Sequence, residues 1–177
     1  FYEWEYQNAS WKRADGNIAY WDNKTNKHTF KAFYPFGKIT SEGAIEMPEL
    51  TGQDGTMTSV AARDFLIAQK DESYATASGV VSLTFNHVSS LITIKLKGEG
   101  DLVGATINQI TITGNNILAS STYKFGETAP VTVTGDQLNT MTLESNCTIT
   151  AGTNKLFYFI FNSGTANLSD VNLTIAY

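Results

Sequence analysis

Apolar and polar residues alternate with a period of two along most of this chain. For example, Ile92, Ile94 and Leu96 alternate with polar residues in the part of the chain up to Lys97. Successive side chains of an extended strand point to opposite faces, so this pattern predicts strands with one buried face. The same alternation occurs in segments 2–7, 28–34, 110–113, 131–133 and 171–177. Segment 156–161 is continuously apolar, which is typical of a strand buried on both faces. The sequence therefore predicts an all-β fold.

Helical periodicity is weak throughout. The best helical candidate, 59–70, is short, and its part 64–67 is read equally well as a strand. Without helices to connect parallel strands, the spacing of strands and turns favours a sandwich or a barrel. Glycine and charge are concentrated in 97–101, which is the best candidate linker. We therefore expect two domains, 1–98 and 99–177.

Two local features predict where strands stop or bend. Pro35 has no N–H to donate, so it should end the strand over 28–34. The buried parity changes between Leu83 and Ile92, which predicts a bulge or tight turn around 87–90.

Composition excludes several classes of function. Charged residues make up 16% of the chain and the formal net charge is −5, so there is no basic surface for nucleic acid or anionic lipid. No apolar run reaches the 18 or more residues that a membrane span needs. The chain begins at Phe1 without a recognisable signal sequence, so we expect any targeting signal to have been removed or to lie outside it.

Catalytic and metal-binding signals are weak. The single cysteine, Cys147, allows no intrachain disulfide, and with only His28 and His87 beside it no Cys/His zinc cluster can form. No nucleophile motif surrounds any serine, and His87 is expected as a partly buried ring that bonds backbone. Cys147 is expected as a small buried apolar residue. We therefore expect no enzyme, no cofactor and no metal site.

Acidic and oxygen-rich loops do not change this expectation. The loops at Asp15 and Asp22 lack the spacing of a calcium-binding loop, and turn formation explains them. A pair of catalytic carboxylates could be drawn from one acidic region, but nothing in the sequence selects two of its members. Those members are Glu42, Glu46, Glu49 and Asp54.

Aromatic residues are concentrated in the first 21 positions. The alternation in 2–7 favours a core position for Tyr2, Trp4 and Tyr6. Trp11 and Trp21 lie near expected turns, so they are the candidates for exposed rings that stack on a sugar. Core packing or structural anchoring remains the favoured role for the whole group.

Several phrases resemble the fimbrillin family of bacterial surface proteins when they are taken in order. They are IAYWD (18–22) with HTFKAFYPFG (28–37), DFLIA (64–68), VSLTFNH (81–87) with LITIKL (91–96), and GATINQITITG (104–114). Each phrase alone is weak, but together they extend over most of the chain.

The resemblance implies two tandem transthyretin-like, Greek-key β-sandwich domains in a pilus subunit. It implies export as a lipoprotein precursor to the outer membrane, and a place in an extracellular fimbria. The implied partners are other pilus subunits, which are joined by exchange of a donor strand, together with host or bacterial surface ligands. The resemblance implies neither enzymatic activity nor a cofactor.

Both ends of the chain differ from the family pattern. The lipid-bearing cysteine is absent, and the chain ends at Tyr177 before the usual closing segment. This leaves open whether the second domain is complete and whether the donor strand lies in this chain. Two hypotheses follow: a fimbrial subunit that polymerises by strand exchange, or a carbohydrate-binding sandwich that uses Trp11 or Trp21.

Overall fold

The protein is built from short antiparallel strands, as the period-two pattern predicts. The computed structural model describes residues 2–8, 10–18, 20–77, 80–115, 117, 120–135, 139–162 and 170–177. Its strands are β1 (Trp4–Gln7), β2 (Ser10–Arg13), β3 (His28–Tyr34), β4 (Ile45–Glu46), β5 (Leu66–Glu72), β6 (Asn86–His87), β7 (Ser90–Lys97), β8 (Thr106–Thr113), β9 (Ser121–Tyr123), β10 (Val131–Val133), β11 (Thr140–Thr148), β12 (Asn154–Phe161) and β13 (Asn172–Ala176). Among these residues the helices are short: α1 (Met57–Ala61), α2 (Tyr74–Ala77) and the 3-10 turn η1 (Gly100–Leu102). The all-β class is confirmed.

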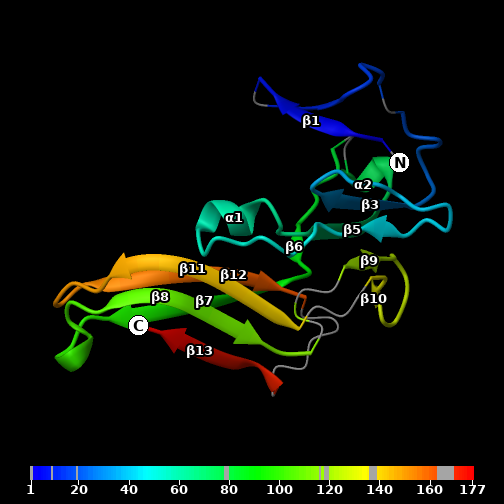
Figure 1. The fold of residues 1–177 in the computed structure, drawn as a ribbon. Helices are drawn as coiled ribbons and strands as arrows, with labels where there is room; N and C mark the ends of the chain where they lie inside the picture. Colours follow the sequence, from blue (N-terminus) through cyan, green and yellow to red (C-terminus); the bar gives the residue numbers. More distant parts are fainter. Residues whose placement is uncertain are drawn as a thin grey trace.

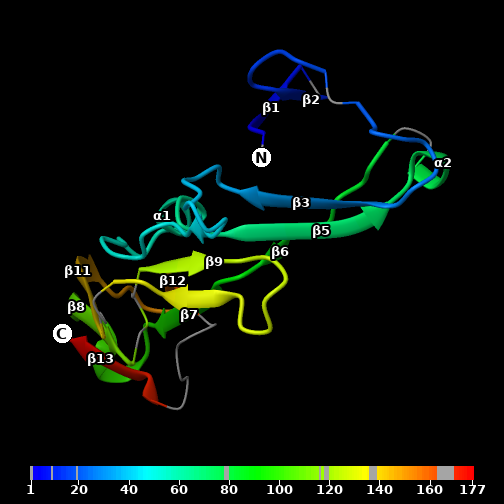
Figure 2. The same ribbon diagram turned by 90° about the vertical axis from the view of Figure 1, so that its right-hand side faces the viewer.

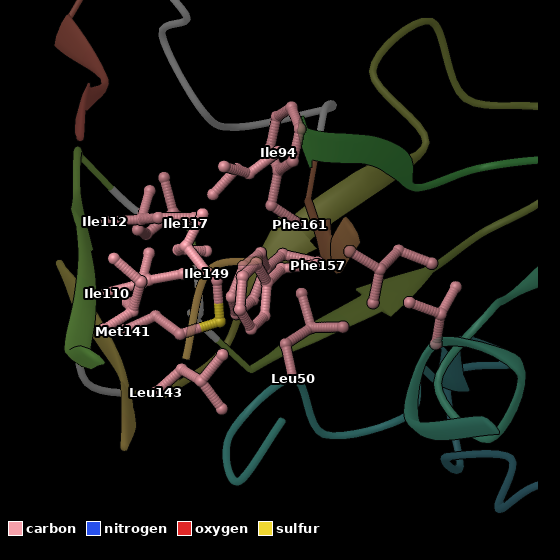
Figure 3. Packing of buried hydrophobic residues seen from close by; sticks show 14 residues of the cluster. Leu50, Ile94, Ile110, Ile112, Ile117, Met141, Leu143, Ile149, Phe157 and Phe161 are labelled. Atoms are coloured by element: carbon pink, nitrogen blue, oxygen red, sulfur yellow. The ribbon is translucent and has the colours of Figure 1, made fainter. Parts of the chain in front are cut away.

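The larger sandwich packs sheet β11-β8-β13 against sheet β12-β7 (Figure 1). Buried isoleucines of β8 pack against the phenylalanines of β12 in this core. Leu50 and Val60 also belong to it. Figure 3 shows Ile110, Met141 and Leu143 on one side of this core, with Phe157 and Phe161 facing them. We call this group the large core: Leu50, Val60, Ile94, Ile107, Ile110, Ile112, Ile117, Met141, Leu143, Ile149, Phe157, Phe159, Ile160 and Phe161.

A second sandwich packs sheet β3-β5-β6 against sheet β10-β9-β4. Its fully buried centre, the small core, is Ile45, Phe65 and Tyr123. The rings of Phe65 and Tyr123 lie 5.9 Å apart between centroids, and Phe33 packs on Phe65 from β3. Aromatic contacts therefore join the two sheets of this smaller unit.

Strand pairing crosses the expected boundary at residue 98. β7 precedes that position but pairs along its whole length with β12, from Ser90↔Phe161 to Lys97↔Asn154. β4 also precedes residue 98, and it pairs with β9, which follows that residue. Backbone hydrogen bonds over long sequence distances therefore override the local glycine-rich signal at 97–101. Residue 98 does not separate the two cores, and the pair of tandem transthyretin-like, Greek-key domains stays a prediction.

The predicted end of the strand before Pro35 and the predicted bend near residues 87–90 agree with the structure. β3 ends at Tyr34, immediately before Pro35. The chain bends at Val88 and Ser89, between β6 in one sheet and β7 in another, which explains the change of parity. In the mixed segment 59–70, only the start belongs to a helix, α1, and the strand β5 begins at Leu66.

Gly98 lies in a tightly packed crossing and not in a free linker. Its N–H donates to the Thr153 carbonyl over 3.2 Å, and its own carbonyl accepts from the Gly152 N–H over 3.1 Å. A Cβ atom at Gly98 would lie 2.2 Å from the Thr150 carbonyl oxygen. This backbone atom cannot move aside without breaking the crossing.

The crossing predicts the effect of a single methyl group. Gly98→Ala should lower the free energy of unfolding by about 1–3 kcal/mol, because the methyl group overpacks the backbone. Urea unfolding followed by tryptophan fluorescence measures the loss. Lys97→Ala, at the exposed neighbouring residue, should stay within about 0.5 kcal/mol of the original chain. Equal stability of the two variants would contradict this packing.

Candidate functional site: an unpaired strand edge and two aromatic groups

The outer edge of β7 is unpaired in the described part of the chain. β7 bonds β12 on one side, and no described strand pairs along its other side. Ile94 is buried in the large core, whereas Ile92 and Leu96 on the same face are half-buried. Such an edge presents a row of backbone N–H and C=O groups that another strand can pair with.

An apolar cavity of about 200 Å³ lies beside this edge. It is lined by Leu96, Lys97, Leu102, Ile107, Ile149, Ile175 and Tyr177. β13 forms its other wall and pairs only with β8 among the described strands. Leu173 and Tyr177, on the same face of this segment as Ile175, remain 48% and 72% exposed. The gap between β7 and β13 can therefore accept both backbone hydrogen bonds and apolar side chains.

The first aromatic group lies on the hairpin of β1 and β2. Tyr6 pairs with Trp11 across the hairpin, and their ring centroids lie 5.4 Å apart. The Arg13 guanidinium lies 3.8 Å from the centre of the Tyr2 ring. Figures 1 and 2 show this hairpin beyond β3, at the end of the molecule away from β13.

The expected core position of this group is wrong. Tyr2, Trp4 and Tyr6 are 64%, 45% and 63% exposed, and Trp11 is 60% exposed. The alternation correctly predicts a strand with an aromatic face, but among the described strands β1 pairs with β2 alone. Because no described sheet packs on this face, its rings stay in solvent.

Trp21, by contrast, is half-buried in the second aromatic group. Its ring meets His28, Phe30 and Tyr74 edge-on, at centroid distances of 5.6, 5.2 and 5.8 Å. These contacts attach the loop before β3 to the face of β3 and to α2. The two tryptophans therefore have different environments, since Trp11 is exposed and Trp21 is packed against other rings. Ligand stacking at either one stays a prediction.

His87 is not the partly buried, backbone-bonded ring expected from the sequence. Its side chain is exposed, and its Nδ1 lies 2.7 Å from an oxygen of the Asp64 carboxylate. The two-residue strand β6 is too short to bury the ring. Cys147, in contrast, is half-buried against the large core, close to its expected role.

Acidic groups in the described residues make local contacts and do not gather around one point. Asp54 accepts from the Thr56 N–H and hydroxyl, and Glu46 pairs with Lys38. No group of three or more His, Cys, Asp or Glu side chains with metal-binding geometry occurs in the ranges that the structure describes.

Glu72 stabilises the end of β5. Hydrogen bonding by the Thr76 hydroxyl, and then by Lys70, lowers the pKa of the Glu72 carboxyl below its ordinary value. A carboxyl whose pKa is lower in the folded state stabilises that state above its unfolded pKa. This contribution is lost as the pH falls through the lowered, folded-state pKa.

Sequence reasoning does not identify the residues of the cavity as a site. Leu96 and Ile175 carry a visible signal, since both alternate with polar residues in their strands. That signal marks a buried face, but it contains no information about which strand edges remain unpaired.

A family model described as fimbrillin-like matches residues 2–177. The chain belongs to the fimbrillin-like family. Nearly the whole sequence is included in the match, so the family resemblance found in the sequence is confirmed.

A solved structure supports the fold of this fimbrillin-like chain. The chain is similar to a crystal structure from Bacteroides ovatus that is described as a candidate cell adhesion protein. The TM-score is 0.55 at 19% identity, and the match includes 94% of the fimbrillin-like chain. It spans 60% of the length of that other chain. None of the curated proteins searched matches. No helix among the described residues is long and apolar enough to cross a membrane.

The packing around Trp21 predicts a difference between two tryptophan substitutions in the fimbrillin-like chain. Trp21→Ala removes three ring contacts and should lower the free energy of unfolding by about 1–3 kcal/mol. Trp11→Ala, at an exposed position, should change it by about 0.5–1 kcal/mol at most. Urea unfolding followed by circular dichroism measures both values. A larger loss at Trp11 would contradict the anchoring role of Trp21.

Proposed function

We propose that the chain is a structural and adhesive subunit of a bacterial surface pilus. The fimbrillin-like match over residues 2–177 is the observation that carries this proposal. The similar fold of a candidate cell adhesion protein supports it. The proposed place of the protein is the cell surface, in an extracellular fimbria made with other pilus subunits.

The proposal extends to the route of export and to chemistry. Family membership supports a lipoprotein precursor that is sorted to the outer membrane. The protein binds other subunits, and in an adhesive position it binds host or bacterial surface ligands. It acts without catalysis or a cofactor, because a pilus subunit works through binding energy. The net charge of −5 disfavours nucleic acid as a partner.

Subunits join by exchange of a strand in this proposal. The unpaired β7 edge and the apolar cavity beside β13 support it, since they supply the two things that a donor strand needs. Backbone bonds along β7 would give affinity, and alternate apolar side chains entering the cavity would set the register. A strand that pairs these groups also stabilises the acceptor by mass action.

A peptide tests the acceptor edge. We use residues 171–177, VNLTIAY, as the probe because its apolar residues share one face. Saturating peptide should raise the melting temperature by about 3 °C or more, since it stabilises only the folded chain. Differential scanning fluorimetry and light scattering measure the shift and any oligomers.

Matched controls distinguish strand addition from nonspecific binding of the peptide. The same peptide with Asn in place of its Leu and Ile should give no shift, because it cannot fill the apolar cavity. Leu96→Glu should abolish the shift, whereas Leu91→Glu, on the opposite face of β7, should keep it. A monomer that is indifferent to the peptide would rule out strand addition at this edge.

Carbohydrate binding is a second candidate function. The exposure of Trp11 beside Tyr6 on one hairpin face favours it, since flat exposed rings stack on the apolar faces of sugars. Trp21 is a weaker candidate because its ring is half-buried among three other rings.

Titration with soluble glycans tests this second function. Saturable quenching of tryptophan fluorescence should appear if the hairpin binds sugar, and Trp11→Ala should remove it. Trp21→Phe should leave the quenching in place, because it keeps an aromatic ring in the packed group. No saturable quenching by any glycan would exclude this function for the chain.

A further inference from the structure

From Tyr158 onward the outer edge of β12 is hydrogen-bonded to other parts of the chain, unlike that of β7. Along this edge the Tyr158 N–H donates to the Gly55 carbonyl over 2.9 Å. Two residues further, the Ile160 N–H donates to the Gln53 side-chain oxygen over 2.8 Å. The next outward amide, that of Asn162, donates to the Ile117 carbonyl over 3.4 Å. These partners take the positions that an added strand would use.

Gln53 takes the place of a backbone unit in this arrangement. Its Nε2 donates to the Ile160 carbonyl, also over 2.8 Å, so one side-chain amide bonds both outward groups of Ile160. The same nitrogen donates to the Leu50 carbonyl over 2.8 Å. Gln53 is only 5% exposed, so loss of its amide would leave buried backbone groups unpaired.

Arg63 holds the segment that carries Gln53. Its Nε and Nη2 donate to the Thr51 carbonyl over 3.0 and 2.8 Å, and Nη2 also donates to the Gly52 carbonyl over 3.1 Å. Its Nη1 donates to the Ser59 carbonyl and hydroxyl over 3.1 and 3.0 Å. One guanidinium group therefore ties residues 51–52 to α1.

Gly55 lets the segment approach the sheet. Its φ is +77°, a conformation that favours glycine. A Cβ there would lie 2.8 Å from Leu143 Cδ2 and 3.2 Å from Phe157 Cδ1. A side chain at residue 55 would press on Leu143 and Phe157, so glycine lets this carbonyl approach the Tyr158 N–H closely.

We propose that residues 51–56 form an edge loop that closes β12 against strand addition by a second copy of this chain. The strand it covers contains the apolar run 156–161, and an open edge of this kind pairs with its equal in another molecule. The inference rests on the proposed function only in assigning β7 as the edge left for a donor strand. The closure of β12 stands on the contacts alone.

Substitution of Gln53 tests the edge loop. Gln53→Glu keeps the size of the side chain but replaces Nε2, which donates to the Leu50 and Ile160 carbonyls, with a second carboxylate oxygen. Repulsion between this oxygen and the two carbonyls should turn the side chain away, so that the Ile160 N–H loses its acceptor. The Ile160 amide should then exchange with solvent about tenfold faster or more. Gln69→Glu, at an exposed position on β5, is the matched control and should leave this exchange rate unchanged. An unchanged Ile160 rate in Gln53→Glu would overturn the proposal.

Self-association is the second readout. Light scattering should show concentration-dependent dimers or larger species for Gln53→Glu, with the Tyr158 and Ile160 amides protected again in the assembled form. A variant that opens this edge but stays monomeric would overturn the blocking role. Arg63→Met provides the same test through the other anchor if Gln53→Glu does not fold.

A core variant separates edge opening from general instability. Ile94→Val should be compared with an edge-loop variant at temperatures where both are equally destabilised. Association of the core variant to the same extent would overturn the proposal. Binding of the 171–177 peptide should persist in Gln53→Glu. If the original chain never binds that peptide, strand addition at β7 fails while the edge-loop result stands.

Discussion

The antiparallel pairing of β7 with β12 is the interaction on which the rest of the structure depends. It joins segments that lie more than fifty residues apart and brings Ile94 opposite Phe157. That pairing builds one wall of the large core, against which the isoleucines of β8 pack from the other sheet. It also explains why a glycine at residue 98 lies in a crowded crossing although its local sequence is typical of a linker.

The two-stranded sheet β12-β7 has two outer edges, and their backbone groups have different surroundings. The β12 edge is closed by the Gln53 amide, by a carbonyl of the same loop and by the residue 117 carbonyl. The β7 edge has no strand beside it in the described ranges, and an apolar cavity adjoins it. Of the two edges of this sheet, only the β7 edge combines unpaired backbone groups with an adjoining apolar cavity among the described residues, which is what the proposed donor strand needs.

Aromatic residues that lie close together in the sequence have different surroundings in the structure. Trp21 is anchored because β3 and α2 provide rings around it. Trp11 and Tyr6 pair across a hairpin that has only two strands and no described layer over its aromatic face. A two-stranded ribbon buries little surface by itself, so its rings remain available to a ligand or to another protein.

The sequence by itself determined most of the longer strand-forming segments, though not β11, together with the end of β3 at Pro35, the all-β class and the family. These properties follow from period-two alternation, turn chemistry and short phrases, all of which are local. Tertiary structure alone decided the partner of β7, the exposure of Tyr6 and Trp11, the cavity beside Leu96 and the closure of β12 by Gln53. Alternation specifies which face of a strand is apolar. The backbone N–H and C=O groups, however, point along the sheet toward neighbouring strands, and the side-chain pattern does not specify which strand they bond. The physical reason is that every backbone unit offers the same donor and acceptor, so long-range packing chooses which edges pair and which stay open.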